Sequence, residues 1–77
     1  MMVVAFVLVQ VETGRAGELV QKIRALPGVA ETYLVAGPHD ILVKVVAEKF
    51  ETVAQTVTER IHKLQGIKNT LTLFAFE

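Results

Sequence analysis

The 77-residue sequence predicts one small α+β domain whose elements follow the order strand, helix, strand, strand, helix, strand. Three observations support this order. Continuous apolar runs alternate with two segments whose apolar residues recur at the helical period. Glycine and proline fall where elements would end. The tetrapeptide Leu26-Pro27-Gly28-Val29 recurs 38 positions later as Leu64-Gln65-Gly66-Ile67, which indicates two related halves.

The first half of the chain predicts a strand, a helix and a second strand. Residues from Met2 to Val11 are almost all β-branched, aliphatic or aromatic, which is typical of a strand covered on both faces. The helix that follows has apolar residues at helical spacing: Ala16, Leu19, Val20, Ile23 and Leu26. Pro27-Gly28 ends this helix, and Val29 to Ala36 forms the next strand.

The second half repeats this pattern after the turn Gly37-Pro38-His39-Asp40. Ile41 to Ala47 is predicted to be a strand. The second helix has one unbroken apolar stripe, consisting of Phe50, Val53, Ala54, Val57, Ile61 and Leu64, and Gly66 caps its end. Ile67 to Phe76 is the last strand. Two βαβ halves of this kind make the ferredoxin-like, split βαβ fold, a four-stranded antiparallel-type sheet with both helices on one face and the first and third strands central.

Side chains alternate across a sheet, so each strand can be divided by parity. Odd positions are expected under the helices: Val3, Ala5, Val7, Val9, Tyr33, Val35, Ile41, Val43, Val45, Leu71 and Leu73. Even positions are expected on the other face: Val4, Phe6, Leu8, Gln10, Thr32, Leu34, Leu42, Lys44, Val46, Lys68, Thr70, Thr72, Phe74 and Phe76. That second face is too apolar for a monomer, which predicts a homodimer packed through it.

Composition points the same way. Area scaling leaves roughly 4,700 Å² exposed in a folded chain of this mass, so the core is thin, and small domains of this kind usually need a disulfide, a metal or a partner. The chain has no cysteine, and its two histidines lie on different elements. We therefore expect association, with no metal and no cofactor. Eight basic residues balance eight acidic ones, which argues against direct nucleic-acid binding. No signal or membrane segment is found, so the expected location is the cytoplasm.

The familiar catalytic and nucleotide-binding motifs are missing, and the chain contains no serine. The most polar turn is Gly37 to Asp40. It is either a hairpin connection in which Asp40 bonds a nearby backbone N–H, or a loop that binds a small polar ligand. Thr70 and Thr72 lie two residues apart on one face of the last strand, either as good β-formers or as ligand contacts. The turn and the threonines become a candidate site if they line one pocket.

The segment from Leu26 to Val45, with its G-x-x-D turn at Gly37 to Asp40, is followed by an amphipathic helix and a T-x-T strand. In this order it resembles the ligand-binding domain of the Lrp/AsnC regulators, also called RAM, for regulation of amino-acid metabolism. The resemblance covers essentially the whole chain, residues 1–77, as a single domain. The chain looks like a stand-alone form without the helix-turn-helix domain. Many members have an acidic residue where this chain has Pro38.

The resemblance implies an effector-binding and oligomerisation module of transcription-regulator type that is not an enzyme. It implies dimers joined through their sheets, dimers assembled into rings, and an amino-acid effector held where dimers meet. Gly37, His39, Asp40, Thr70 and Thr72 are the positions that match the effector site.

Two alternatives stay open. One is a small dimeric α/β-barrel enzyme of isomerase or monooxygenase type, for which the even-numbered face offers only Gln10, Lys44, Lys68 and threonines. The other is an interaction module that co-assembles with a full-length regulator. No membrane partner is expected.

Overall fold

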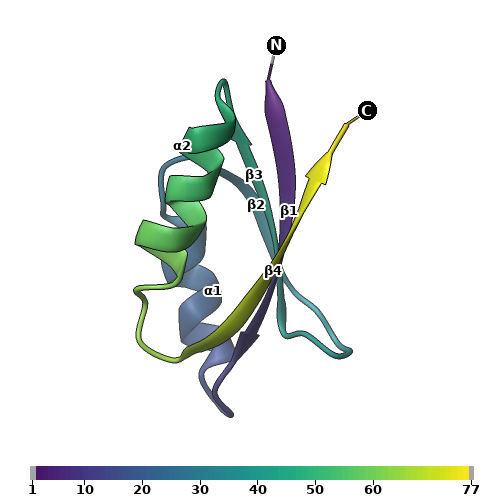
Figure 1. The fold of residues 1–77 in the computed structure, drawn as a ribbon. Helices are drawn as coiled ribbons and strands as arrows, with labels where there is room; N and C mark the ends of the chain where they lie inside the picture. The colour runs from purple at the N-terminus through teal and green to yellow at the C-terminus, as the bar shows by residue number, and fades with distance from the viewer. Residues whose placement is uncertain (1, 77) are drawn as a thin grey trace.

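The computed structural model describes residues 2–76 and shows two layers, a sheet and a pair of helices (Figure 1). The elements in chain order are β1 (Val3–Val11), α1 (Ala16–Arg24), β2 (Val29–Leu34), β3 (Ile41–Ala47), α2 (Phe50–Gln55), a π-helical segment (Thr56–Ile61) and β4 (Ile67–Ala75). The predicted element order is confirmed.

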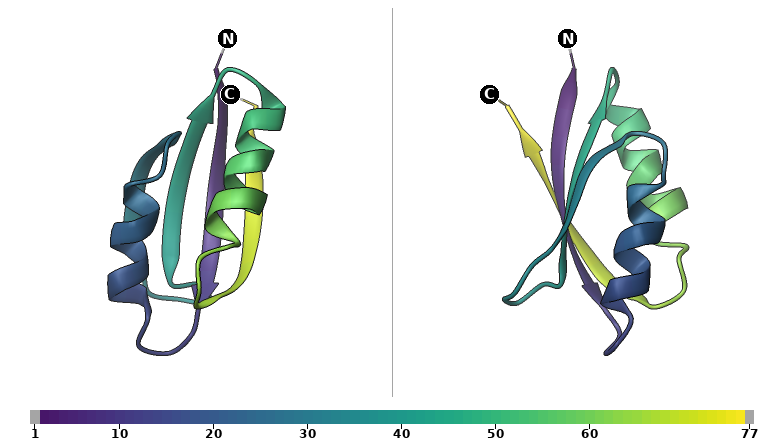
Figure 2. Two further views of the ribbon diagram at one scale, coloured as in Figure 1. Left: turned by 90° about the vertical axis from the view of Figure 1, so that its left-hand side faces the viewer. Right: turned by 180° about the vertical axis from the view of Figure 1, so that it is seen from behind.

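The four strands form one antiparallel sheet in the order β2-β3-β1-β4, so β1 and β3 are central as predicted. Both helices cover the same side of this sheet, and the two termini lie together at one end of it (Figure 2). This is the ferredoxin-like arrangement. The other side of the sheet, which no helix or strand of residues 2–76 covers, is called the open face below.

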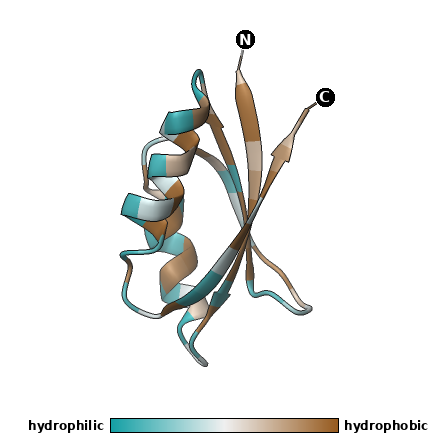
Figure 3. Cartoon of the chain, viewed as in Figure 1, coloured by the Kyte–Doolittle hydropathy of each residue, from teal (hydrophilic) through white to brown (hydrophobic). Residues whose placement is uncertain are grey.

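The hydrophobic core lies between the central strands and the helices. Ala5, Val7 and Val9 of β1 are fully buried in one cluster with Leu19 of α1 and Val53 of α2. The folded chain exposes 4916 Å², close to the roughly 4,700 Å² that its mass predicts. Figure 3 shows hydrophobic strands beside helices whose outer surfaces are hydrophilic. The core is therefore thin, and much apolar surface belongs to the sheet.

Each edge strand contains one extra residue. Val11 pairs with Ile67 but Gln10 pairs with Asn69, so Lys68 is the extra residue of β4. Val29 pairs with Val45 but Glu31 pairs with Lys44, which makes Ala30 the extra residue of β2. A one-residue shift of register moves every later side chain of a strand to the opposite face.

The parity prediction is consequently right for β1 and β3 and wrong for most of β2 and β4. Register partners share a face. Opposite the buried Val43 and the buried Val7 lie Thr32 and Thr72, so both threonines are on the helix side. Three residues predicted under the helices, Tyr33, Leu71 and Leu73, lie on the open face opposite Leu42, Leu8 and Phe6. Three residues predicted on the open face, Leu34, Thr70 and Phe74, share a face with Ile41, Val9 and Ala5 on the helix side.

The open face is nevertheless strongly apolar, because Leu71, Leu73 and Tyr33 take the place of Leu34 and Phe74 on it. The register places these residues on it: Val4, Phe6, Leu8, Gln10, Glu31, Tyr33, Leu42, Lys44, Val46, Asn69, Leu71, Leu73 and Ala75. Leu71 and Leu73 are 48% and 51% exposed.

Two other expectations need correction. The strand predicted to reach Ala36 ends at Leu34, because Gly37, with φ of 149°, and Pro38 turn the chain, and Val35 is exposed in that turn. The single α-helix predicted from Phe50 changes to a π-helix at Thr56. Within residues 2–76, no helix is long and apolar enough to cross a membrane.

Candidate functional site

The turn between β2 and β3 projects to the open side of the sheet (Figure 1). Its ends are tied by two backbone hydrogen bonds of 2.9 Å, in which Val35 N–H donates to Asp40 O and Asp40 N–H donates to Val9 O. Gly37 has a φ of 149°, a conformation open to glycine and rare for residues with a side chain. The turn is thus anchored to the sheet at Asp40 and shaped by Gly37.

Asp40 bonds a backbone N–H, as the hairpin interpretation expected, but the donor is distant in the sequence and not a nearby residue. Its Oδ2 accepts a hydrogen bond of 2.9 Å from the backbone N–H of Val11, at the bulged end of β1. The side chain is half-buried. An ionised carboxylate has about four acceptor positions, so one bond leaves capacity for a ligand.

Gly37, Pro38 and His39 line an open hollow of about 410 Å³, called the turn hollow below. Leu8 and Leu42 of the open face form its floor, and Val35 and Ala36 complete the lining. The hollow is therefore mostly apolar, with His39 as its titratable member. It offers room for a small side chain beside a polar turn.

Gln10 and Asn69 tie this end of the sheet together, which the spacing of the residues did not indicate. Asn69 Nδ2 donates to Gln10 Oε1 at 2.6 Å, and Gln10 Nε2 points at the carbonyl of Pro38 at 3.5 Å. Two amides thus connect β4, β1 and the turn. The available signal was Gln10 itself, the one polar interruption in an apolar strand.

Thr70 and Thr72 lie on the helix side of β4, opposite Val9 and Val7. Both are half-buried, and the Thr70 hydroxyl lies 2.6 Å from Nε2 of His62. Within one chain the threonines and the turn hollow are therefore on opposite faces of the sheet. A single copy does not bring the predicted site residues together.

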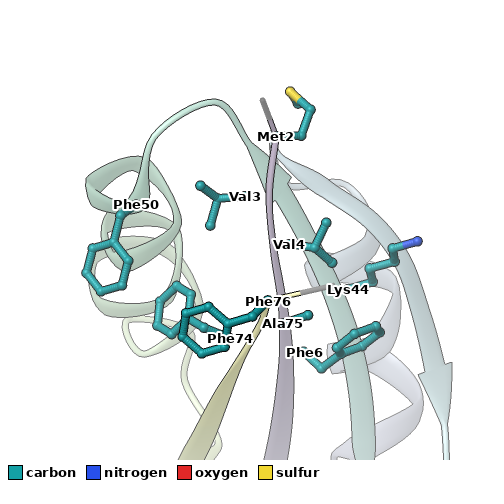
Figure 4. Close-up of a pocket in the computed structure, with 9 residues that line it drawn as sticks. All are labelled: Met2, Val3, Val4, Phe6, Lys44, Phe50, Phe74, Ala75 and Phe76. Carbon is teal, nitrogen blue, oxygen red and sulfur yellow. The ribbon is translucent and has the colours of Figure 1, made fainter.

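A second cavity, called the aromatic cavity, lies where the ends of β1 and β4 meet the start of α2 (Figure 4). Its volume is about 610 Å³, and all four phenylalanines of the chain, Phe6, Phe50, Phe74 and Phe76, line it with Met2, Val3, Val4, Lys44 and Ala75. The rings of Phe50 and Phe74 stack with centroids 4.4 Å apart. Phe50 is 56% exposed although the helical stripe predicted it in the core.

A charged cluster lies on the open face, where the sequence placed Lys44 without a partner. Lys44 Nζ is 3.4 Å from Oε2 of Glu31, and the Tyr33 hydroxyl donates a hydrogen bond to Oε1 of the same carboxylate. The bond from Tyr33 and the nearby ammonium lower the pKa of Glu31. The pKa of Tyr33 is raised, because its deprotonation would lose this bond and place two negative charges together. Among residues 2–76, no three His, Asp or Glu side chains gather as a metal site would require.

Comparison with known proteins gives the family. Residues 4–77 match the family model of the Lrp/AsnC ligand binding domain. The chain belongs to this family. An uncharacterised HTH-type transcriptional regulator of Pyrococcus furiosus is 36% identical over 75 residues, which cover 94% of this chain and 50% of that regulator. The chain thus spans about half the length of the curated Lrp/AsnC-type relatives it matches.

Solved structures agree. The crystal structure of TTHA0845 from Thermus thermophilus is 39% identical, with a TM-score of 0.93, and the match covers 97% of this chain and 94% of that one. The transcriptional regulator NMB0573 of Neisseria meningitidis, solved in complex with L-Met, shares the fold at a TM-score of 0.86 and 18% identity, over 97% of this chain and 50% of that one. Sequence and fold thus both support the assignment to the Lrp/AsnC family.

Proposed function

We propose that this Lrp/AsnC domain binds an amino-acid effector and assembles with further copies of itself to form the complete binding site. The observation that carries the proposal is the division of the matching positions. Gly37, His39 and Asp40 lie around the turn, whereas Thr70 and Thr72 lie on the opposite face of the sheet. A site that uses both sets needs two chains.

The two sets together offer hydrogen-bond partners for both ends of a free amino acid. Backbone N–H groups of the turn and the two threonine hydroxyls would hold the α-carboxylate. Asp40 would accept from the α-ammonium, which gives a charge-assisted hydrogen bond in a partly dry site. The apolar turn hollow beside Asp40 would take the side chain. The complex of the Neisseria meningitidis regulator with L-Met supports this class of ligand.

The open face supports assembly as a two-fold dimer. The sheet has four neighbouring strands of six to nine residues, so the flat area of its open face is on the order of 500 Å². The side chains that project from the face add to this area. This area lies toward the upper end of the roughly 300–600 Å² of the largest patch on a typical monomer, and it approaches the roughly 800 Å² that each partner contributes to a stable interface. Because the site would join chains, the effector would favour the assembly that completes it.

An enzyme of the dimeric barrel type fits less well. The structure does place two more titratable groups, Glu31 and Tyr33, on the open face than the sequence indicated. However, the pKa of Glu31 is lowered and that of Tyr33 is raised, so both move away from the neutral range where a general acid or base works best. The relatives are named transcriptional regulators.

The effector role is tested by calorimetry with each of the twenty amino acids. Asp40→Asn is the informative variant, because Asn keeps an acceptor for Val11 N–H and loses only the charge. We expect one amino acid, or a few related ones, to release heat, and both Asp40→Asn and Thr72→Val to weaken that binding at least tenfold. Thr13→Val, in an exposed turn, is the control and should bind normally. No heat from any amino acid would rule out the effector role.

The assembly is tested by mass in dilute solution. We expect a dimer or a multiple of it for the wild type, and a shift toward monomer for Leu73→Lys, which places a charge at a 51% exposed position of the open face. A wild type that stays at 8.5 kDa would show the dimer to be wrong.

Co-assembly with a full-length regulator is the second candidate. It is favoured by the relatives, of which this chain covers only 50% and which are named HTH-type regulators. Mixed oligomers formed on mixing with such a regulator, together with no heat from amino acids, would select this function.

A further inference from the structure

Glu31, Tyr33 and Lys44 form one connected group on the open face where edge strand β2 meets β3, called the Glu31 cluster below. Glu31 of β2 lies directly opposite Lys44 of β3 in the register. Their side chains are 44% and 35% exposed, and each is bound to the other across 3.4 Å. Tyr33 holds the second carboxylate oxygen of Glu31. The three side chains are thus joined through the Glu31 carboxylate within a single chain.

The surroundings of the cluster are apolar. Lys44 is flanked across the sheet by Phe6, and Tyr33 by Leu42. At the positions that the register pairs in the described strands, Lys44 and Glu31 are the charged residues of the open face. At these paired positions the face therefore carries one positive and one negative charge, and these two neutralise each other.

The pairing of Lys44 with Glu31 becomes important when the open face is buried in an interface. An ammonium buried without a partner is strongly unfavourable, whereas one that is paired and hydrogen-bonded is tolerated. Two-fold symmetry doubles the effect, because an isologous interface contains the same patch from both subunits. An unpaired lysine on this face would thus be buried twice in one interface.

We infer that Glu31 is a positioning residue of the assembly: by neutralising Lys44 within its own chain, it makes the open face fit for a second copy of the same chain. The inference rests on the proposed sheet-to-sheet dimer. It names the feature of the open face that favours a second copy of the chain over other partners. A neutral cluster does not repel its symmetry mate. A partner that presents an uncompensated charge at this place would be rejected by the apolar residues around it.

The experiment compares dimer dissociation constants of four proteins by sedimentation velocity over a dilution series. These are the wild type, Glu31→Gln, Lys44→Met and the double variant. Glu59→Gln, which removes the same charge from the exposed helical layer, is the matched control. Circular dichroism confirms that each variant is folded.

Each single variant leaves one charge without its partner, so we expect the dissociation constant to rise at least about tenfold. The double variant removes both charges and should return to within about threefold of the wild type, or bind more tightly, because apolar replacements of an ion pair are often neutral or stabilising. Glu59→Gln should match the wild type.

The outcomes separate this inference from the proposed function. A wild type that is monomeric at every concentration contradicts the dimer itself. A dimeric wild type whose single variants dissociate at the same concentration contradicts only the role of Glu31. So does a double variant as weak as the two single changes combined.

Tyr33 supplies a second, independent readout. It is the only tyrosine in a chain without tryptophan, so the phenolate absorbance reports this side chain alone. In the wild type its pKa is raised by Glu31. We expect Glu31→Gln to lower it, and an unchanged titration would show that the Glu31 cluster does not form in solution.

Discussion

Asp40 shows how one residue can serve the fold and the candidate site together. The carboxylate accepts a 2.9 Å hydrogen bond from Val11 N–H, a residue of another strand. Replacing Asp40 by Ala should lower the free energy of unfolding by about 1.5–3 kcal/mol, the range for a hydrogen bond to a charged group. Asp40→Asn should lose clearly less, because it keeps an acceptor. Urea unfolding of both variants tests this, and equal midpoints for Ala and Asn would contradict it.

The partner of Asp40 could not be found from the sequence. A bond from Asp40 to a nearby N–H was expected within the turn, because Asx turns are local. The actual donor is 29 positions away, and the antiparallel pairing of β1 and β3 brings it there. Local spacing carries no information about such a contact.

Thr32 is an unusual residue of the core. Its side chain is 3% exposed, and its hydroxyl has no hydrogen-bond partner within residues 2–76. Burial of an unpaired hydroxyl costs about 1–3 kcal/mol in mutational data, and valine has nearly the same shape. Thr32→Val should therefore raise the thermal unfolding midpoint.

Thr56→Val is the matched control for Thr32→Val. Thr56 is also buried, at 4% exposure, but its hydroxyl donates to the carbonyl of Thr52 at 3.0 Å. This change should give no gain in the midpoint. A destabilised Thr32→Val protein would mean that the Thr32 hydroxyl is satisfied in solution.

At the scale of the elements, the internal repeat proves to be a repeat of backbone geometry. Leu26 N–H donates to Ile23 O after α1, and Leu64 N–H donates to Ile61 O after the π-helix. Gly28 and Gly66 then both take a positive φ, of 86° and 104°. The Leu-x-Gly signal therefore predicted the turn after each helix, because only glycine adopts that conformation cheaply. The helices themselves end before the leucines, at Arg24 and Ile61.

Gly66 is the less tolerant of these two glycines. A Cβ there would lie 3.1 Å from Cδ1 of Leu19, a fully buried side chain. Gly66→Ala should therefore destabilise by more than the roughly 1–2 kcal/mol of a left-handed residue alone. Gly17→Ala is the contrasting variant: it lies in α1 with open space around it and should stabilise by about 0.5–1 kcal/mol. Chemical denaturation measures both, and equal losses would contradict the argument.

The faces of the edge strands were beyond sequence reasoning. Alternation gave the buried residues of β1 and β3 correctly, because these strands run without interruption. In β2 and β4 the extra residues, Ala30 and Lys68, reverse the alternation of side chains. Neither alanine nor lysine is a residue type that predicts a bulge. The wrong faces predicted for Thr70, Thr72 and Tyr33 all follow from these two bulges.

The helix after β3 changes form for a related local reason. Thr56 and Thr58 bond back to the carbonyls of Thr52 and Ala54, at 3.0 and 2.8 Å. Such bonds compete with the helical ladder and loosen it. The apolar stripe predicted a helix correctly but could not distinguish an α-helix from a π-helix.

At the scale of the whole molecule, acid should weaken the fold through two exposed carboxyls. Glu18 has a pKa below its ordinary value of 4.5, mainly because of the hydrogen bond from Arg15, and Glu31 is lowered by Tyr33 and Lys44. A lowered pKa means that the stabilisation is present above the ordinary value and is lost as the pH falls through the lowered one. Melting temperatures should fall on acidification below about pH 4.5.

Glu18→Gln tests this dependence. The variant lacks the titrating group, so its melting temperature should fall less on acidification than that of the wild type. Glu59→Gln serves as the control and should follow the wild type. Parallel curves for all three proteins would show that Glu18 makes no pH-dependent contribution.

The two bulges also bear on whether further strands can add to the edges of the sheet. An apolar sheet with two free edges offers rows of unpaired N–H and C=O groups to which further strands can add without limit. Here each free edge is interrupted, at Ala30 on one side and at Lys68 on the other, where a positive charge stands as well. Growth by strand addition is thereby hindered at both edges. The apolar open face can therefore pack on a second copy, while the interrupted edges disfavour open-ended growth of the sheet.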